Sequence, residues 1–304
     1  MSDLDPGFLD QKYLVDPYGN WARGEGVPIV TGASIDVMAL ETRPWARFGM
    51  KGAICHVDGR CDYLTAFVFE IAAGASSAPM RHVYEECFYV LDGAGTSEIT
   101  LSDGTRHVAE WGPKTLFAAP VNASCVLRAS GTRPARLVVL NDLRYLMGLY
   151  RNEAFLFANP THFESRQAKA VAAGLSLDPC QLADGAVPLA DMSLGVDLAS
   201  TRARKEGQAR RQMQGQHLLG LEGEGFTLSF TGRDTEIVRT DWRHGILTGL
   251  PGMSFHQHVS AGETPARMLT VELGSMSSPM FRSRRAAYGD TNVYASGAAT
   301  MAGR

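Results

Sequence analysis

The chain has 304 residues, 45% of them hydrophobic, and its 29 basic and 32 acidic residues leave a net charge of −3. This length is enough for two domains of ordinary size, and the charge gives no pull toward nucleic acid or an anionic membrane. No apolar run approaches the roughly 20 residues of a membrane span, and the acidic, polar N-terminus is unlike a signal peptide. The five cysteines form no Cys-x-x-Cys pair, so we expect a cytoplasmic protein that acts on small molecules.

In chain order, residues 1–50 have few regular signals and are expected to form an N-terminal arm that packs on the neighbouring domain or on a second subunit. Residues 51–141 contain short runs of β-branched and aromatic residues separated by glycine turns, which predicts an antiparallel barrel. Residues 142–186 begin with a helical pattern that a proline stops, and are expected to form a helical linker. We expect a second barrel in residues 187–274 and a C-terminal tail in residues 275–304.

An internal repeat relates the two strand-rich regions. Several residues recur at one offset of 131 residues, and the turn at Gly93 recurs at Gly223, one residue closer. A shared long period indicates a tandem duplication, and a single inserted residue explains the difference between the two offsets. The matched pairs are Trp111 with Trp242, Pro120 with Pro251, Cys125 with His256, and Pro134 with Pro265.

Both copies carry the spacing of a known pair of motifs. His82, Glu86 and Gly93 are spaced like the last three residues of the first motif of the cupin superfamily, and Met80 stands where that motif has its first His. In the second copy, His256 lies five residues after a proline, as in the second cupin motif. The chain therefore resembles the two-cupin (bicupin) families that include the gentisate-type ring-cleaving dioxygenases and the bicupins labelled as ethanolamine ammonia-lyase activators.

This resemblance implies an all-β fold of two tandem cupin barrels, also called a double-stranded β-helix or jelly roll. It further implies a few short helices in the arm and linker, and a homodimer or higher homo-oligomer. In each barrel the motif residues would point into the lumen, because residues i and i+2 of a strand share a face. The matched positions are Met80, His82, Glu86 and Cys125 in the first copy, and Arg210, Gln212, Gln216 and His256 in the second.

Neither set is the usual three His and one Glu, so the metal ligands need a separate argument. His256 and His258 lie two residues apart on one predicted strand and share a face. His217 would join them only if a bulge turned it inward. We expect either one divalent metal ion on these three imidazoles, with Fe first and Mn, Ni, Cu or Zn also compatible, or no metal. In the first barrel, Cys125 is expected to be a small buried residue more often than a ligand.

Three functions remain open at this point. The resemblance favours a metal-dependent, dioxygenase-type oxidoreductase acting on a small carboxylate-bearing molecule, with Arg210, Gln212 and Gln216 binding the substrate. No acidic residue occupies the matched positions of the second copy, so Arg210 is expected to pair with an anionic substrate and to take part in catalysis. The alternatives are a metal-free lyase or isomerase in which His82 and Glu86 form an acid-base pair, and a non-catalytic small-ligand-binding or activator protein.

Overall fold

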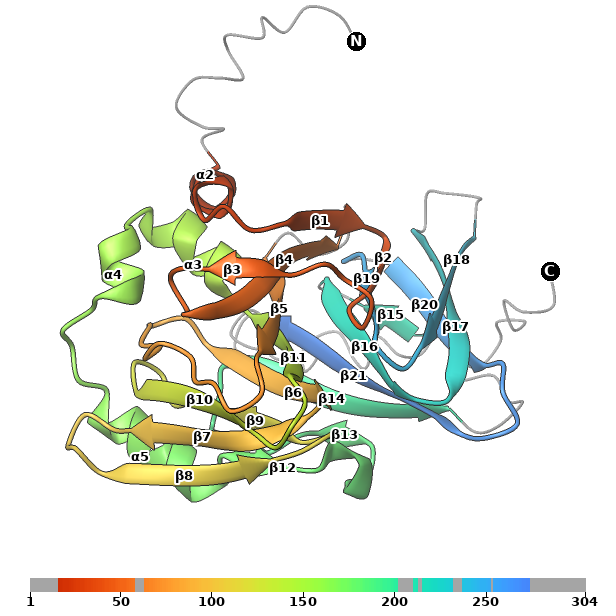
Figure 1. The fold of residues 1–304 in the computed structure, drawn as a ribbon. Helices are drawn as coiled ribbons and strands as arrows, with labels where there is room; N and C mark the ends of the chain where they lie inside the picture. The colour runs from red at the N-terminus through yellow and green to blue at the C-terminus, as the bar shows by residue number, and fades with distance from the viewer. Residues whose placement is uncertain are drawn as a thin grey trace, which may run out of the picture.

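The computed structural model describes residues 16–57, 63–201, 210–212, 215–231, 237–252 and 254–273. In these residues β-strands prevail and form two barrels that lie side by side (Figure 1). The prediction of an all-β fold with two tandem barrels is confirmed. None of the helices in the described ranges is long and apolar enough to cross a membrane.

The first barrel consists of a large sheet in the order β1-β4-β5-β11-β6-β9-β12, with β3 added to β4, and a small sheet in the order β10-β7-β8. Its strands are β1 (Ile29–Gly32), β3 (Arg43–Trp45), β4 (Met50–Val57), β5 (Thr65–Ile71), β6 (Glu86–Asp92), β7 (Ala94–Thr100), β8 (Arg106–Trp111), β9 (Leu116–Ala118), β10 (Ser124–Ser130), β11 (Ala135–Asn141) and β12 (Ser176–Leu177).

The second barrel has one sheet in the order β13-β14-β21-β16-β19-β2 and another in the order β15-β20-β17-β18. Its strands are β2 (Ser34–Asp36), β13 (Gly185–Ala186), β14 (Leu194–Thr201), β15 (Arg210–Gln212), β16 (Gln216–Glu222), β17 (Glu224–Thr231), β18 (Val238–Arg243), β19 (Ile246–Leu250), β20 (Ser254–Ser260) and β21 (Ala266–Leu273).

The segments outside the two repeats attach to both barrels. In the N-terminal arm, β1 and β3 join the first barrel while β2 pairs with β19 of the second. Helix α2 (Pro17–Gly24) buries Tyr18 and Trp21 in the first core. The segment between the barrels carries α3 (Leu143–Tyr150), α4 (Glu153–Phe157), α5 (Glu164–Ala173) and the short helix η1 (Pro179–Gln181).

Equivalent backbone contacts recur in the two barrels at the offsets that the sequence predicts. Gly95 on β7 pairs with Trp111 on β8, and Gly225 on β17 pairs with Trp242 on β18. Cys125 lies opposite Ile99, as His256 lies opposite Ser229. The tandem duplication therefore has the register that the repeated residues indicate.

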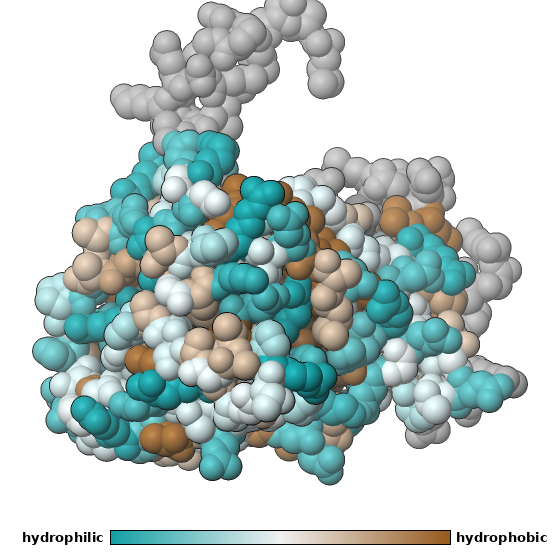
Figure 2. Space-filling view, viewed as in Figure 1, coloured by the Kyte–Doolittle hydropathy of each residue, from teal (hydrophilic) through white to brown (hydrophobic). Residues whose placement is uncertain are grey.

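Each barrel turns one sheet toward the other barrel, so this sheet is buried on both faces. Along β6, Phe88 and Val90 belong to the first lumen while Cys87 and Tyr89 face the second barrel. On the face shown in Figure 2, hydrophilic side chains prevail and hydrophobic ones are scattered, because the large apolar surfaces are turned inward. The core between the barrels includes Cys55, Val57, Val68, Leu91, Val138 and Leu140 from the first barrel and Val196, Leu198, Leu219, Leu221, Leu269 and Val271 from the second.

A buried carboxylate also fastens the second barrel to the first. Glu85, just before β6, accepts hydrogen bonds from the backbone N–H of Ser193 at 2.6 Å, from the Ser193 hydroxyl at 2.7 Å and from the backbone N–H of Leu194 at 3.0 Å. Arg166 of α5 pairs with the other oxygen of this carboxylate. Glu85 therefore holds the start of β14, the first long strand of the second barrel, against β6.

His217 lies in the region between the barrels and not in the second lumen. Its neighbour Leu218 packs with Trp242 inside the barrel, while Leu219 belongs to the core between the barrels. His217 is fully buried, and neither ring nitrogen has a hydrogen-bond partner among the described residues. Burial lowers its pKa to about 3, with smaller contributions from Arg144 and His56. The register of β16 against β21 shifts only between Gly220 and Glu222 in the described residues, so no bulge at His217 turns this imidazole inward.

The repeated glycines give a first prediction. A Cβ at Gly95 would lie 2.1 Å from the carbonyl oxygen of Arg128, and a Cβ at Gly225 would lie 2.4 Å from the carbonyl oxygen of Val259. Overpacking of this kind usually costs about 1–3 kcal/mol, so we expect Gly95→Ala and Gly225→Ala each to lower the free energy of unfolding by at least about 1 kcal/mol in urea denaturation. Gly112→Ala, whose Cβ would meet no atom within 4 Å, is the matched control, and an equal loss in all three variants would contradict the argument.

His217 gives a second prediction, on pH dependence. The unfolded chain binds a proton on this histidine near pH 6.5 and the folded chain only near pH 3, so stability is lost as the pH falls through this window. The difference at pH 5 amounts to about 2 kcal/mol. We expect His217→Leu to remove this loss, measured as the change in unfolding free energy between pH 7.5 and pH 5.

The comparison is between wild type and variant at each pH, because Asp142, whose pKa burial raises to about 7, acts in the opposite direction in both proteins. His162→Leu, at an exposed histidine, is the control. If His217→Leu and wild type show the same pH dependence, His217 does not carry the effect.

Candidate functional site

The first lumen holds the predicted His82–Glu86 pair, but as a closed contact. Nε2 of His82 lies 2.8 Å from Oε1 of Glu86, and Nδ1 lies 2.9 Å from the carbonyl oxygen of Tyr84. Both ring nitrogens of His82 are therefore engaged by oxygen atoms of the protein. The ring also stacks on Tyr84 at a centroid distance of 3.6 Å.

The other two matched residues of the first barrel do not complete a metal site. Met80 and Cys125 exchange backbone hydrogen bonds across the barrel edge, and both side chains are buried. Burial, together with the nearby charge of Glu86, raises the pKa of the Cys125 thiol well above its ordinary value. A metal binds the thiolate, so this neutral thiol acts as a small apolar residue.

Aromatic and branched side chains fill the rest of the first lumen. Phe88 and Phe117 stack with parallel rings at a centroid distance of 4.7 Å, and Trp111 also stacks on Phe117, at 6.1 Å. All three side chains belong to one buried cluster with Phe67, Ile99, Leu127 and Val139. The first barrel is therefore packed like an ordinary protein core.

The second lumen is polar at the same positions. The strand pairings show which residue of one barrel corresponds to which residue of the other. Phe67 pairs with Val139 in the first barrel and Asp197 pairs with Thr270 in the second, so Phe67 corresponds to Asp197 and Val139 to Thr270. A further match follows from Ser97 opposite Leu127 and Thr227 opposite His258. Large apolar side chains are replaced by small or polar ones: Phe67 by Asp197, Ile99 by Ser229, Phe117 by Thr248, Cys125 by His256, Leu127 by His258 and Val139 by Thr270.

His256 and His258 lie together, as their spacing predicts. Their ring centroids are 5.0 Å apart, and both lie on β20 opposite polar residues of β17. Nδ1 of His258 lies 2.9 Å from Oγ1 of Thr227, which in turn accepts a hydrogen bond from the indole N–H of Trp242 at 3.0 Å. The second lumen therefore contains a histidine whose orientation is fixed by two buried neighbours.

Carboxylates also face this lumen, at positions outside the matched motif residues. Glu272 on β21 accepts a hydrogen bond from Nε2 of Gln216 at 2.8 Å, so Gln216 serves to hold this carboxylate. Asp197 is on the face of β14 that also carries Ala199 of the second core. Burial raises the pKa of Asp197. The motif positions do not include Asp197 and Glu272, because these residues lie on strands outside the two motifs. Extending the internal repeat beyond the motifs would have found them, since Asp197 corresponds to Phe67 and Glu272 to Asn141.

Arg210 and Gln212 are placed only by their backbone. They lie on β15, where Arg210 is opposite His256 and Gln212 is opposite Ser254, and their side chains are outside the described part of the chain. This position agrees with that of Met80 opposite Cys125 in the first barrel. The role of Arg210 in catalysis and in binding an anion stays a prediction.

A metal centre is not assembled from the described residues. His256 and His258 supply two imidazoles, but the third expected imidazole, His217, faces the other barrel. Within the described ranges there is no group of three or more His, Cys, Asp or Glu side chains that could hold a metal ion. The donor set that the structure places therefore does not fit the three-histidine site.

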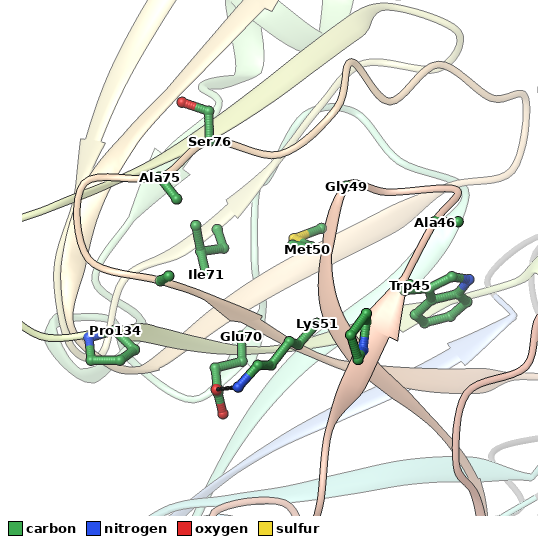
Figure 3. A pocket seen from close by; sticks show the side chains of 12 residues that line it. Trp45, Ala46, Gly49, Met50, Lys51, Glu70, Ile71, Ala75, Ser76 and Pro134 are labelled. Atoms are coloured by element: carbon green, nitrogen blue, oxygen red, sulfur yellow. Dashed lines mark hydrogen bonds and ion pairs between the residues drawn. The ribbon is translucent and has the colours of Figure 1, made fainter.

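Two surface pockets lie away from these residues. One of about 460 Å³ lies on the first barrel between the β3–β4 hairpin and the loop after β5 (Figure 3). Trp45, Met50 and Ile71 line it, and Lys51 bonds Glu70 at 3.3 Å on its wall. The other, of about 590 Å³, lies beside the turn after β16. Neither pocket is lined by a candidate site residue.

Comparisons with known proteins place the fold. No protein-family model matches the chain, and no curated protein matches it in sequence. Among solved structures, the oxalate decarboxylase of Bacillus subtilis matches with a TM-score of 0.57 and 10% identity, over 85% of this chain and 83% of that one. The vicilin of Corylus avellana (hazelnut) matches with a TM-score of 0.54 and 9% identity, over 84% of this chain and 93% of that one. At these identities the likeness concerns the fold alone, and that fold is the two-barrel fold of the bicupins.

Proposed function

We propose that this protein binds a small, hydroxyl-bearing organic molecule in the lumen of its second barrel, where His256 and His258 contact it. The observation that carries the proposal is the difference between the two barrels. The same backbone positions hold packed rings in the first lumen and hydroxyls, imidazoles and carboxylates in the second. A duplicated barrel needs only apolar filling to be stable, so the polar set has another purpose.

Burial of polar groups supports this reading. A hydroxyl, imidazole or carboxylate removed from water without a hydrogen bond costs roughly 1–3 kcal/mol by mutational measures. Asp197 is half-buried, its carboxylate has no hydrogen bond or ion pair to a described residue, and burial raises its pKa. Groups of this kind are stabilised when a ligand or ordered water supplies the missing partners.

The charge of the lumen favours hydroxyl groups on the ligand. Asp197 and Glu272 are acceptors when ionised, so a ligand with hydroxyl donors fits them and a bare anion does not. Binding of the anionic substrate expected from Arg210 would require the positive charge of this side chain to outweigh the negative charges of Asp197 and Glu272. A small hydroxylated molecule, with or without one carboxylate facing Arg210, satisfies both sets of groups.

No reaction step follows from the described residues. The dioxygenase-type oxidoreductase implied by the bicupin resemblance requires a metal ion, and the Mn(II) centres known in Bacillus subtilis oxalate decarboxylase belong to that protein. The metal-free lyase or isomerase would use His82, which is enclosed by Tyr84, Glu86 and a packed core. Ligand binding, the third expectation from the sequence, therefore has the most support.

The binding proposal is tested by making the second lumen resemble the first. His258→Leu introduces the residue of the first barrel at this position, and Ser97→Ala, at the first-barrel position of Thr227, is the matched control. We expect one of the hydroxyl-bearing probes glycerol, erythritol, glucose and glycerate to raise the melting temperature of wild type and of Ser97→Ala, but not of His258→Leu.

At 100 times its Kd such a ligand stabilises the fold by about 2.7 kcal/mol, which calorimetry resolves. A stabilisation that His258→Leu retains in full would place the ligand outside the second lumen.

Metal content separates binding from the oxidoreductase reading. We expect protein purified without chelators to contain well under one equivalent of Fe, Mn, Ni, Cu or Zn by elemental mass spectrometry, because the described donors do not form a three-ligand set. His256→Ala should then leave the metal content unchanged. One equivalent that disappears in His256→Ala and persists in Cys125→Ala would make the second lumen a metal centre and replace our proposal.

A further inference from the structure

We infer that Thr227 is a positioning residue that fixes the tautomer of His258, with the lone pair of Nδ1 bound to the Thr227 hydroxyl and the proton of the imidazole on Nε2. The inference rests on the proposed function, because it specifies the hydrogen-bonding state of a histidine in the lumen that we propose binds the ligand. The tautomer itself is a property of the ligand-free protein.

The first step is the placement of three side chains on three neighbouring strands. Thr227 on β17 lies directly opposite His258 on β20, and β18 brings Trp242 to the other side of Thr227. The distances are 2.9 Å from Oγ1 to Nδ1 of His258 and 3.0 Å from the indole nitrogen to Oγ1. Thr227 is 1% exposed and Trp242 is 2% exposed, so water does not compete for these bonds.

The second step is a count of protons. An indole N–H only donates, so it uses a lone pair of the Thr227 oxygen. The hydroxyl has one proton of its own, and among the described residues the Nδ1 atom of His258 is its one available acceptor. If Nδ1 carried a proton, the buried hydroxyl would have two donors directed at it and no acceptor for its proton, which costs roughly 1–3 kcal/mol. The favoured state is therefore a hydroxyl that donates to Nδ1 and an imidazole protonated on Nε2.

The first barrel provides an internal comparison. The equivalent residues are Ser97, Trp111 and Leu127. There the Ser97 hydroxyl reaches the carbonyl of Ala109 at 3.4 Å, and the Trp111 indole N–H has no hydrogen-bond partner among the described residues. The chain of hydrogen bonds is present in the barrel that has an imidazole at its end and missing in the barrel that has a leucine there.

The consequence concerns what can meet His258. Nε2 lies across the ring from Thr227, and with a proton on it this atom donates to a carbonyl, hydroxyl or carboxylate oxygen. It has no lone pair for a metal ion in this tautomer. Any group that meets Nε2 of His258 is thus expected to be a hydrogen-bond acceptor.

The test reads the tautomer directly in the full chain. Histidine labelled with ¹⁵N in the ring gives long-range ¹H–¹⁵N spectra that distinguish protonated from unprotonated nitrogens, and His258→Leu assigns the signals. We expect wild type at pH 8 to show Nδ1 of His258 unprotonated and Nε2 protonated. Thr227→Val, which keeps the shape and removes the hydroxyl, should give a mixture of both tautomers, whereas Thr227→Ser should restore the wild-type spectrum.

Trp242→Phe checks the role of the indole. Without its N–H, the Thr227 oxygen is free to accept from Nδ1, so the share of the Nδ1–H tautomer should rise while circular dichroism shows an intact fold. Wild-type His258 protonated on Nδ1, or a Thr227→Val spectrum identical to wild type, would overturn the inference and leave the proposed binding site untouched. Failure of every probe to bind would leave the tautomer result standing, so the two failures are distinguishable.

Discussion

The burial of one sheet of each barrel on both faces constrains the rest of the structure. One face of this sheet closes its own lumen and the other packs on the neighbouring barrel, so nearly every residue of β6, β11, β16 and β21 is buried. Glu85 adds a directed contact by holding the start of β14 through three hydrogen bonds, and its other oxygen pairs with Arg166 of α5. The two barrels therefore share one apolar core and stabilise each other.

This constraint explains how the duplicated barrels diverged. Gly93 and Gly223 both have positive φ, and an added Cβ in either would meet the α-carbon of an alanine in the last long strand of its barrel. Such backbone contacts leave no room for change, so the glycines are the same in both copies. In the first barrel the lumen residues need only fill the available volume. In the second barrel hydroxyl and imidazole groups could therefore replace the aromatic rings.

This exchange of lumen side chains gives the two barrels different roles. In the first, His82 and Glu86 are hydrogen-bonded to each other within a packed core, and burial raises the pKa of the Cys125 thiol. In the second, the Gln216–Glu272 bond and the Trp242–Thr227–His258 chain hold polar groups in fixed orientations. Fixed hydrogen-bonding groups in a lumen bind a ligand with little loss of side-chain entropy, which fits our proposal that the first barrel supports and the second binds.

Much of the fold could be predicted because it depends on local and repeated signals. Turn glycines, short β-branched runs and the offset between Trp111 and Trp242 are visible in the sequence, and each reports a backbone contact that the duplication preserved. The pair His256 and His258 was predictable for the same reason, since two residues i and i+2 on a strand share a face.

Tertiary structure alone decided the rest of the candidate site. In a strand buried on both faces, hydrophobicity does not reveal which face is the lumen, so the sequence could not exclude His217 as a third ligand. Asp197, Thr227 and Glu272 lie on strands outside both motifs, and only the pairing of those strands brings them to His258 and Gln216. The sequence by itself determined two barrels and their register, because those depend on spacing along the chain. Which lumen is packed and which is polar depends on contacts between strands, and these exist only in the folded protein.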